Sequence, residues 1–198
     1  MTHDVGISRV VGLGNFGAKY AQTRHNIAWL ILVALESRGA FGGERRKTLY
    51  GIREGVVEGI TLMTVRPYTY MNSSGDGVRA MLRDTRSNLD SVVIVHDDLD
   101  LPFGRLRIRK GGSSGGQRGV QSLIERLGTK EFIRLRVGIG RPPSGMDPVD
   151  YVLHTFTEAE WQQIPSVLER AADGILALAR DGLETAMNHF NRDVRQEV

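Results

Sequence analysis

The stretch that decides the fold is VVGLGNFGAKYAQTRHN, residues 10–26. A short apolar run ends in glycines, and Asn15, Tyr20, His25 and Asn26 follow it within one turn-rich segment. A strand that ends in this way delivers polar side chains to one edge of a sheet, and open α/β sheets bind ligands outside the carboxyl ends of their strands. His25 is therefore a candidate proton carrier, because imidazole titrates near neutral pH.

The same segment contains a pattern that points to a different fold. Gly12, Gly14 and Gly17 spell G-x-G-x-x-G, the fingerprint of dinucleotide-binding sites. That fingerprint needs a helix that opens at the glycines and meets a pyrophosphate with its N-terminus. Here the residues after Gly17 are polar and loop-like, and the apolar helical pattern starts after Asn26, a suitable N-cap. The nearby acid, Glu36, falls on that helix, so the pattern disfavours a dinucleotide site.

The length and composition narrow the class of protein. We expect the 198 residues to form a single domain, residues 1–198. The absence of cysteine excludes a disulfide framework and a thiolate metal site. No apolar run reaches the length of a membrane span, and the N-terminus lacks the basic and apolar pattern of a signal peptide. A cytoplasmic protein with no membrane contact is the default expectation.

The charge of the chain is distributed unevenly. The net charge is only +3, while the calculated isoelectric point is about 9.4. Clustered basic residues are typical of proteins with a phosphate-bearing partner, and an ordinary solvated face explains them equally well at this point. The clustered residues are Arg105, Arg107, Arg109, Lys110, Arg118, Arg134, Arg136 and Arg141.

Strand and helix patterns alternate along most of the chain. This order predicts an α/β fold, a single domain with a twisted mixed central sheet flanked by helices. We expect strands at residues 8–13, 48–57, 60–65, 91–95, 105–109 and 133–139. We expect helices at residues 26–38, from 73 or 74 through 82, at 116–127 and at 158–180, and loops at 40–47 and 140–148.

Four polar clusters each follow a predicted strand where it gives way to a loop. A carboxylate at a strand end can accept a hydrogen bond from one imidazole nitrogen, which orients the ring and makes the other nitrogen a better base. Asp97 is our candidate for this role toward His25. Asparagine amides suit holding a substrate backbone, a water or an oxyanion, because they donate and accept without charge. The clusters are Asn15 with His25, RPYTYMN at 66–72, HDDLDLP at 96–102 and KGGSSGGQRG at 110–119.

Each cluster has a plainer explanation when it is taken alone. A single histidine near a helix start is often a cap or a packed residue, and MNSSG at 71–75 is also typical of a strand end with a helix cap. HDDLD at 96–100 fits a capped turn and equally a cation site. The glycine-rich stretch lets a large ligand approach the backbone, although it lacks the G-K-[ST] ending of a nucleotide P-loop.

The four clusters in this order resemble the bacterial-type peptidyl-tRNA hydrolase family over nearly the whole chain. The resemblance implies hydrolysis of the ester that joins a peptide to tRNA, without metal or cofactor, on a single α/β domain. Peptidyl-tRNA is then the partner, and we expect a monomer. The matching segments are GLGNFG with Tyr20 and TRHN, RPYTYMNSSG, HDDLDLPFGRLRIRKGGSSGG and RLRVGIGRP.

The resemblance also implies roles for individual residues. His25 matches the family's catalytic base and Asp97 its carboxylate partner. Asn15, the third member of the expected catalytic set, and Asn72 match the asparagines that hold the substrate and the attacking water. The residues that resemble walls for the 3′ adenosine and the peptide end are Tyr20, Tyr70 and Met71. The residues at positions where the family clamps tRNA phosphate are Arg109 and Arg136.

One departure from the family pattern keeps other functions open. The family usually reads GGHNG where this chain has Gly116-Gln117-Arg118-Gly119, and an arginine is larger than an asparagine and only donates. We expect Arg118 at the rim of the site, in contact with phosphate. One alternative is a catalytically silent RNA-binding relative of the same fold. A second is a metal-dependent phosphoesterase that uses HDDLD.

Overall fold

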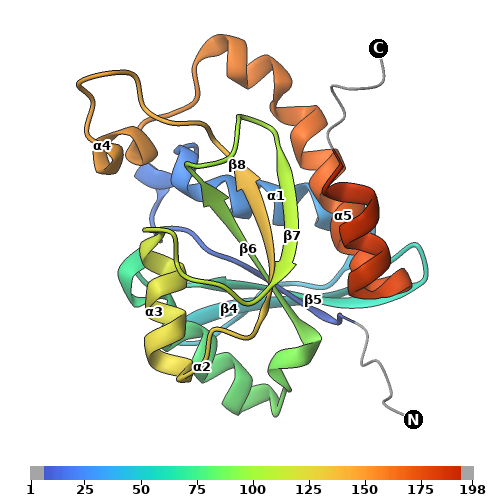
Figure 1. Ribbon diagram of the computed structural model, residues 1–198. Helices are drawn as coiled ribbons and strands as arrows, with labels where there is room; N and C mark the ends of the chain where they lie inside the picture. The colour runs from blue at the N-terminus through green and yellow to red at the C-terminus, as the bar shows by residue number, and fades with distance from the viewer. Residues whose placement is uncertain (1–6, 193–198) are drawn as a thin grey trace.

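The centre of the molecule is an eight-stranded mixed sheet, seen in a computed structural model that describes residues 7–192 (Figure 1). Its order is β2-β4-β5-β1-β6-β8-β7, and the short β3 pairs with β4. The four central strands β5, β1, β6 and β8 are parallel, whereas β4 and β7 run antiparallel to their neighbours. The strands are β1 Arg9–Gly12, β2 Ala40–Phe41, β3 Arg45–Arg46, β4 Tyr50–Val57, β5 Ile60–Pro67, β6 Val92–Asp98, β7 Leu106–Lys110 and β8 Ile133–Gly138.

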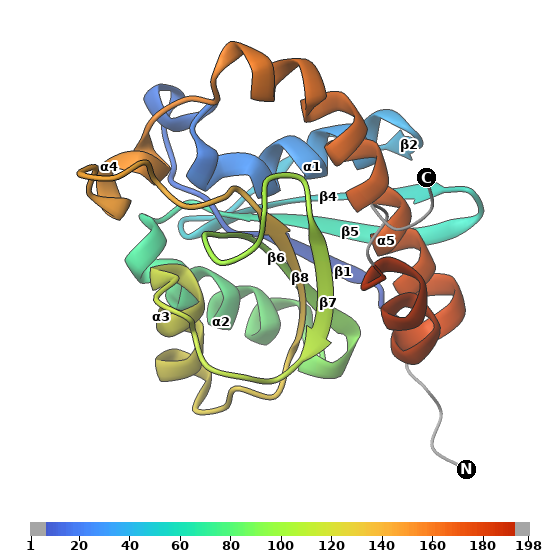
Figure 2. The ribbon, with the colours of Figure 1, turned by 45° about the horizontal axis from the view of Figure 1, so that its top comes forward.

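Helices cover both faces of this sheet. In Figure 2, α1 and α5 lie on one side and α2 and α3 on the other. None of the helices within residues 7–192 is long and apolar enough to cross a membrane. The α-helices are α1 Ile27–Ser37, α2 Ser74–Thr85, α3 Arg118–Leu127, α4 Pro148–Leu153 and α5 Glu158–Phe190. The 3₁₀ helices are η1 Ala18–Tyr20, η2 Arg24–Asn26, η3 Met71–Ser73 and η4 Leu89–Ser91.

Alternating side chains of the central strands build two apolar cores. Val10 of β1 packs with the α1 and α5 side, and its neighbour Val11 packs with the α2 and α3 side. Val93 and Ile94 of β6 divide in the same way. Strands that are covered on both faces read as continuous apolar runs, which is why the sequence patterns of these strands could be recognised.

The predicted fold class is confirmed, and several element boundaries are corrected. The predicted loop at 40–47 contains β2 and β3, which are too short to show a periodic pattern. The loop at 140–148 ends in the unpredicted helix α4, although Asp147-Pro148 is a helix-start signal whose carboxylate accepts a hydrogen bond from Val149 N. The helix predicted to end at 180 continues to Phe190 across a break at Gly182, where φ is 80°. The predicted domain of 1–198 includes termini that lie outside the described residues.

The glycines at the end of β1 allow close packing of α1 and do not form the dinucleotide-binding turn that the sequence disfavoured. The first α-helix begins at Ile27, ten positions after Gly17, and only the three-residue 3₁₀ helix η1 follows the glycines directly. A Cβ on Gly14 would lie 2.8 Å from Nε1 of Trp29, whose indole donates to Gly12 O at 2.9 Å. Glycine is therefore required there for α1 to approach the strand end.

Candidate active site

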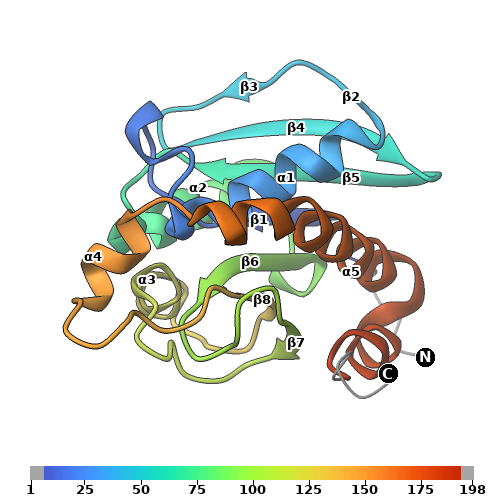
Figure 3. The same ribbon diagram turned by 90° about the horizontal axis from the view of Figure 1, so that it is seen from above.

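The candidate site lies at the carboxyl edge of the parallel strands. Gly12 of β1 is in register with Val95 of β6, so Asn15 and Asp97, a few residues further on, reach the same edge. Figure 3 shows α4 and the start of α3 at one end of the sheet. The order of the strands therefore brings together clusters that are far apart in the sequence.

His25 and Asp97 form a buried pair at this edge. Nδ1 of His25 lies 2.7 Å from Oδ2 of Asp97, and the two residues are only 8% and 2% exposed. His25 sits on η2, immediately before α1. An ionised carboxylate only accepts, so Nδ1 donates to it and Nε2 is left as the proton acceptor. The predicted contact between the two residues is present.

Asp97 is held in its charged form although it is buried. Burial by itself raises the pKa of the Asp97 carboxyl, but the positive charge and hydrogen bond of His25 and a hydrogen bond from Gln117 outweigh it. The net pKa lies below its ordinary value of 3.8. A carboxylate that stays ionised stabilises the imidazolium that forms when His25 takes up a proton.

Asn15 is fixed by its neighbour Asn26. The Asn26 amide donates to Asn15 O at 2.9 Å and accepts from Asn15 N at 2.9 Å. Asn26 occupies the predicted N-cap position of α1, but its side chain bonds to Asn15 and makes no capping hydrogen bond. The side-chain oxygen of Asn15 accepts from Met71 N at 2.8 Å, so its NH₂ group is the end that a ligand can use.

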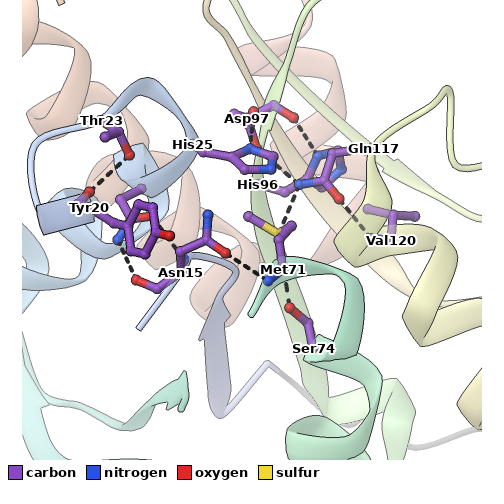
Figure 4. Close-up of polar contacts among 11 residues, drawn as sticks. Asn15, Tyr20, Thr23, His25, Met71, Ser74, His96, Asp97, Gln117 and Val120 are labelled. Carbon is purple, nitrogen blue, oxygen red and sulfur yellow. Dashed lines mark hydrogen bonds and ion pairs between the residues drawn. The ribbon is translucent and has the colours of Figure 1, made fainter. Parts of the chain in front are cut away.

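Asn15, His25 and Asp97 line a cavity of about 270 Å³. Tyr20 and Tyr70 face each other edge to plane, with ring centroids 6.5 Å apart, and Tyr70 is 63% exposed. Figure 4 shows Tyr20, Asn15 and Met71 arranged on one side of the His25–Asp97 pair. The cavity thus joins polar groups at its base to aromatic and apolar walls. The predicted residues that line it are Asn15, Tyr20, His25, Tyr70, Met71, Asn72, Asp97 and Arg118.

Arg109 and Arg136 are not among the residues that line this cavity. Nε of Arg136 donates to Oδ2 of Asp98 at 2.6 Å, while Arg109 lies against the glycine-rich loop, where a Cβ on Gly112 would meet its guanidinium at 2.6 Å. Both side chains therefore lie on β7 and β8, outside the lining of the cavity.

Arg134, which was counted among the clustered surface charges, is a buried structural residue. It is 2% exposed, and its guanidinium donates to Gly112 O and to Ser113 O, the latter at 2.7 Å. Burial, with the nearby charges of Arg109 and Arg136, lowers its pKa to about 10. Arg134 thereby fastens the glycine-rich loop to the sheet.

The three aspartates of HDDLD have separate partners. Asp97 binds His25 and Gln117, Asp98 binds Arg136, and Asp100 binds Arg141. No group of three or more metal-ligating side chains occurs in the part of the chain that the structure describes. This arrangement disfavours the phosphoesterase alternative, because a cation site needs the carboxylates to converge.

Comparisons with known proteins identify the family. The family model for peptidyl-tRNA hydrolase matches residues 9–197. The chain is 43% identical over 183 residues to the peptidyl-tRNA hydrolase of Chloroflexus aggregans, covering 92% of this chain and 97% of that protein. It is 44% identical to that of Moorella thermoacetica, with 92% and 96% coverage. The chain belongs to the peptidyl-tRNA hydrolase family.

A solved structure of this family has the same fold. The crystal structure of peptidyl-tRNA hydrolase from Acinetobacter baumannii superposes with a TM-score of 0.87 at 30% identity. The superposition covers 96% of this chain and 97% of that one. The resemblance drawn from the four sequence clusters is thus confirmed over the length of the described structure.

Arg24 stabilises the framework of the site, and no role for it was predicted. It is 4% exposed, and it donates to Thr155 O at 2.6 Å and to Oε2 of Glu160 at 2.7 Å. Its guanidinium also lies 4.2 Å from the ring centroid of Tyr151. These contacts fix the turn that carries the next residue, His25. The burial of a charged residue beside the candidate base was not visible in the sequence.

Further unpredicted residues come from the N-cap of α3 and from α4, and the cavity is also lined by Asp98, Leu99, Gly115 and Gly116. Gln117, the N-cap residue of α3, donates to Oδ1 of Asp97 at 2.9 Å. The helix was predicted to begin at residue 116, so the sequence did not indicate this contact. The apolar face of α4 forms one wall of the cavity, and no helix was predicted there. The lining residues of α4 are Pro148, Val149, Val152 and Leu153.

Proposed function

We propose that this chain hydrolyses the ester bond between the peptide and the tRNA of peptidyl-tRNA. Nε2 of His25 takes a proton from a water molecule, and the water oxygen attacks the ester carbonyl carbon. The tetrahedral intermediate then collapses, and the ribose oxygen of tRNA leaves with the proton that the imidazolium returns. The single observation that carries the proposal is the 2.7 Å His25–Asp97 pair at the wall of a cavity in a chain of this family.

The two asparagines supply neutral polar groups next to the base. Asn15 has its NH₂ group available, since its oxygen is occupied by Met71 N. Asn72, on η3, is exposed at the cavity wall. We assign the two asparagines the role of binding the substrate backbone, the attacking water and the developing oxyanion. Preorganised hydrogen-bond donors lower the activation barrier where negative charge develops in the transition state.

The walls of the cavity fit the two parts of the substrate beside the ester. Tyr20 and Tyr70 offer aromatic surfaces for the 3′ adenosine, and base–aromatic stacking contributes about 1–3 kcal/mol per base. Met71 and the apolar face of α4 are suited to the peptide end. A hydrophobic wall of this kind tolerates varied side chains, because it makes few directional contacts.

Three arginines are proposed to contact tRNA phosphates. Arg118 is exposed at the first position of α3, at the positive end of the helix dipole, and has no carboxylate partner in residues 7–192. Arg109 and Arg136 extend this charge along β7 and β8. A phosphate bound at Arg136 would share its guanidinium with the carboxylate of Asp98. We also predict that the enzyme is monomeric and cytoplasmic. A measurement of its mass in solution tests whether it is a monomer.

Release of peptide from purified N-blocked aminoacyl-tRNA, in the presence of a chelator, tests the proposal. We expect turnover by the wild-type chain, little hydrolysis of unblocked aminoacyl-tRNA, and a loss of about 10²-fold or more in His25→Ala, the scale of general-base removal. His154→Ala is the matched control, because His154 lies outside the cavity. Tight tRNA binding without turnover would instead support the silent RNA-binding relative. A requirement for added divalent cation would overturn the proposed mechanism.

A further inference from the structure

Gln117 uses both ends of its side-chain amide inside the site. Its Oε1 accepts a hydrogen bond from Val120 N at 2.7 Å, which makes Gln117 the N-cap of α3. Its Nε2 donates to Oδ1 of Asp97 at 2.9 Å and lies 3.3 Å from Sδ of Met71 (Figure 4). One uncharged side chain therefore joins the start of a helix to the carboxylate beside the candidate base.

The orientation of this amide is determined by its surroundings. A backbone N–H can only donate, so the atom that faces Val120 N must be the oxygen. An ionised carboxylate can only accept, so the atom that faces Asp97 must be the nitrogen. A flip of the amide would set donor against donor at one end and oxygen against oxygen at the other. The cap of α3 thus forces an N–H group toward Asp97.

Asp97 is consequently held at both of its oxygens. Oδ2 bonds to His25 Nδ1 and Oδ1 bonds to Gln117 Nε2, so the carboxylate cannot rotate without losing one contact. His25 in turn needs a fixed carboxylate to keep Nε2 as the free acceptor. We propose that Gln117 is a positioning residue, which locks the Asp97 carboxylate and through it the ring of His25. This inference rests on the proposed function, because it assigns a role within the same reaction.

The substitution Gln117→Asn separates this role from helix capping. Asparagine is a preferred N-cap residue, so the start of α3 is retained. Its side chain is one methylene shorter and cannot span the distance to Asp97 while it caps. Gln121→Asn is the matched control, since Gln121 lies on the same helix, is exposed and contacts only Glu125 by its amide. Gln117→His is the rescue variant, because an imidazole N–H can donate to a carboxylate.

A second substitution, Gln117→Glu, tests the electrostatic side of the proposal. It keeps an oxygen for Val120 N but places a second carboxylate against Asp97, which favours the protonated form of the neighbouring imidazole. The acid limb of the pH profile of kcat/KM then moves to higher pH, by about one unit. A side chain at residue 117 that did not reach Asp97 would leave this limb in place.

The decisive measurements are kcat, KM and the pH profile on peptidyl-tRNA, with thermal unfolding to verify the fold of each variant. We expect Gln117→Asn to lower kcat by about 10- to 100-fold with a smaller change in KM, Gln117→His to recover most of it, and Gln121→Asn to match wild type. Wild-type kcat in a folded Gln117→Asn variant overturns the proposal.

An NMR titration of His25 in the free protein provides a test that needs no turnover. Gln117→Glu should raise the titration midpoint of the ring relative to wild type, and an unchanged midpoint overturns the contact between residue 117 and Asp97 on which the proposal rests. If the wild-type chain fails to hydrolyse peptidyl-tRNA while this midpoint still moves, the proposed function has failed and the positioning contact stands.

Discussion

Replacing Asp97 by asparagine changes the hydrogen bonding of the site more than its shape. The carboxylate accepts at both oxygens, from His25 Nδ1 and from Gln117 Nε2. The new amide has one oxygen and one NH₂ group, so one of these contacts becomes donor against donor. Gln117 cannot turn to accommodate it without releasing its hydrogen bond from Val120 N. The NH₂ group therefore faces His25, Nδ1 must accept, and the ring proton moves to Nε2, where it blocks the base.

The magnitude follows from the charge that the substitution removes. His25 and Asp97 are 8% and 2% exposed, so solvent screens their attraction only weakly. Opposite charges about 4 Å apart attract by about 4 kcal/mol at an effective dielectric constant of about 20. This attraction exists only after His25 has become charged, so its loss raises the barrier, and about 1.4 kcal/mol corresponds to each tenfold in rate. We expect kcat to fall by about 10³-fold in Asp97→Asn.

Single-turnover release of peptide from N-blocked aminoacyl-tRNA measures this loss without interference from product release. Asp90→Asn serves as the control, because Asp90 is an exposed acid whose carboxylate binds Lys110. Thermal unfolding of both variants verifies the fold, and activity should not respond to a chelator. A folded Asp97→Asn variant that retains more than about a tenth of wild-type kcat would refute the reasoning, because neither the charge nor the ring orientation would then matter.

Two further predictions concern charge outside the catalytic pair. Replacing Arg109 and Arg136 together by alanine should raise KM, leave kcat unchanged and flatten the dependence of KM on salt, because each lost phosphate contact reduces counterion release. If KM measured over a range of ionic strengths depends on salt as in wild type, the two arginines are ordinary surface charges. His96 is 2% exposed, and burial lowers its pKa from 6.5. Below pH 6.5 the His96 imidazole therefore binds a proton in the unfolded state but not in the folded state. The free energy of unfolding keeps its full value above pH 6.5 and decreases as the pH falls below 6.5, by up to about 1.4 kcal/mol per pH unit. Denaturant unfolding of His96→Asn across this range should show a shallower slope, and equal slopes would contradict the assignment.

The contact between His25 and Asp97 agrees with the prediction that Asp97 orients His25. His25 and Asp97 are 72 positions apart, and each follows a strand with a strongly apolar pattern. The strand patterns placed each residue after a strand, whereas the parallel pairing of β1 with β6, which brings the two strand ends to the same edge, is known from the structure. The same reasoning fails for short edge strands and for helices such as α4, whose stability comes from tertiary packing more than from a periodic sequence.

The glycine-rich cluster reaches the site by a route that the sequence does not reveal. Lys110, at the end of β7, pairs with Ile133 at the beginning of the antiparallel β8, so β7 ends at the edge opposite the active site. The chain then crosses back to the start of α3, with φ of 58° and 83° at Gly115 and Gly116 (Figure 1). Arg134 holds this crossing through two carbonyl groups. A basic residue in an exposed-looking strand pattern gave no sign that it was buried for this purpose.

The departure of Gln117 and Arg118 from the family's usual His-Asn pair bears on whether the chain is a silent relative. The two side chains have different environments, because Gln117 points to Asp97 while Arg118 is exposed at the rim. A change at residue 117 that removed the donor would have freed the carboxylate, yet the amide keeps an N–H on it at 2.9 Å. The change at residue 118 adds a charge where the helix dipole already favours an anion. Both changes are therefore compatible with turnover. The arginine at residue 118 predicts a higher affinity for tRNA phosphate, so Arg118→Ala should raise KM and leave kcat unchanged. A fall in kcat with KM unchanged would instead place Arg118 beside the reacting atoms, in the position of a water or oxyanion donor.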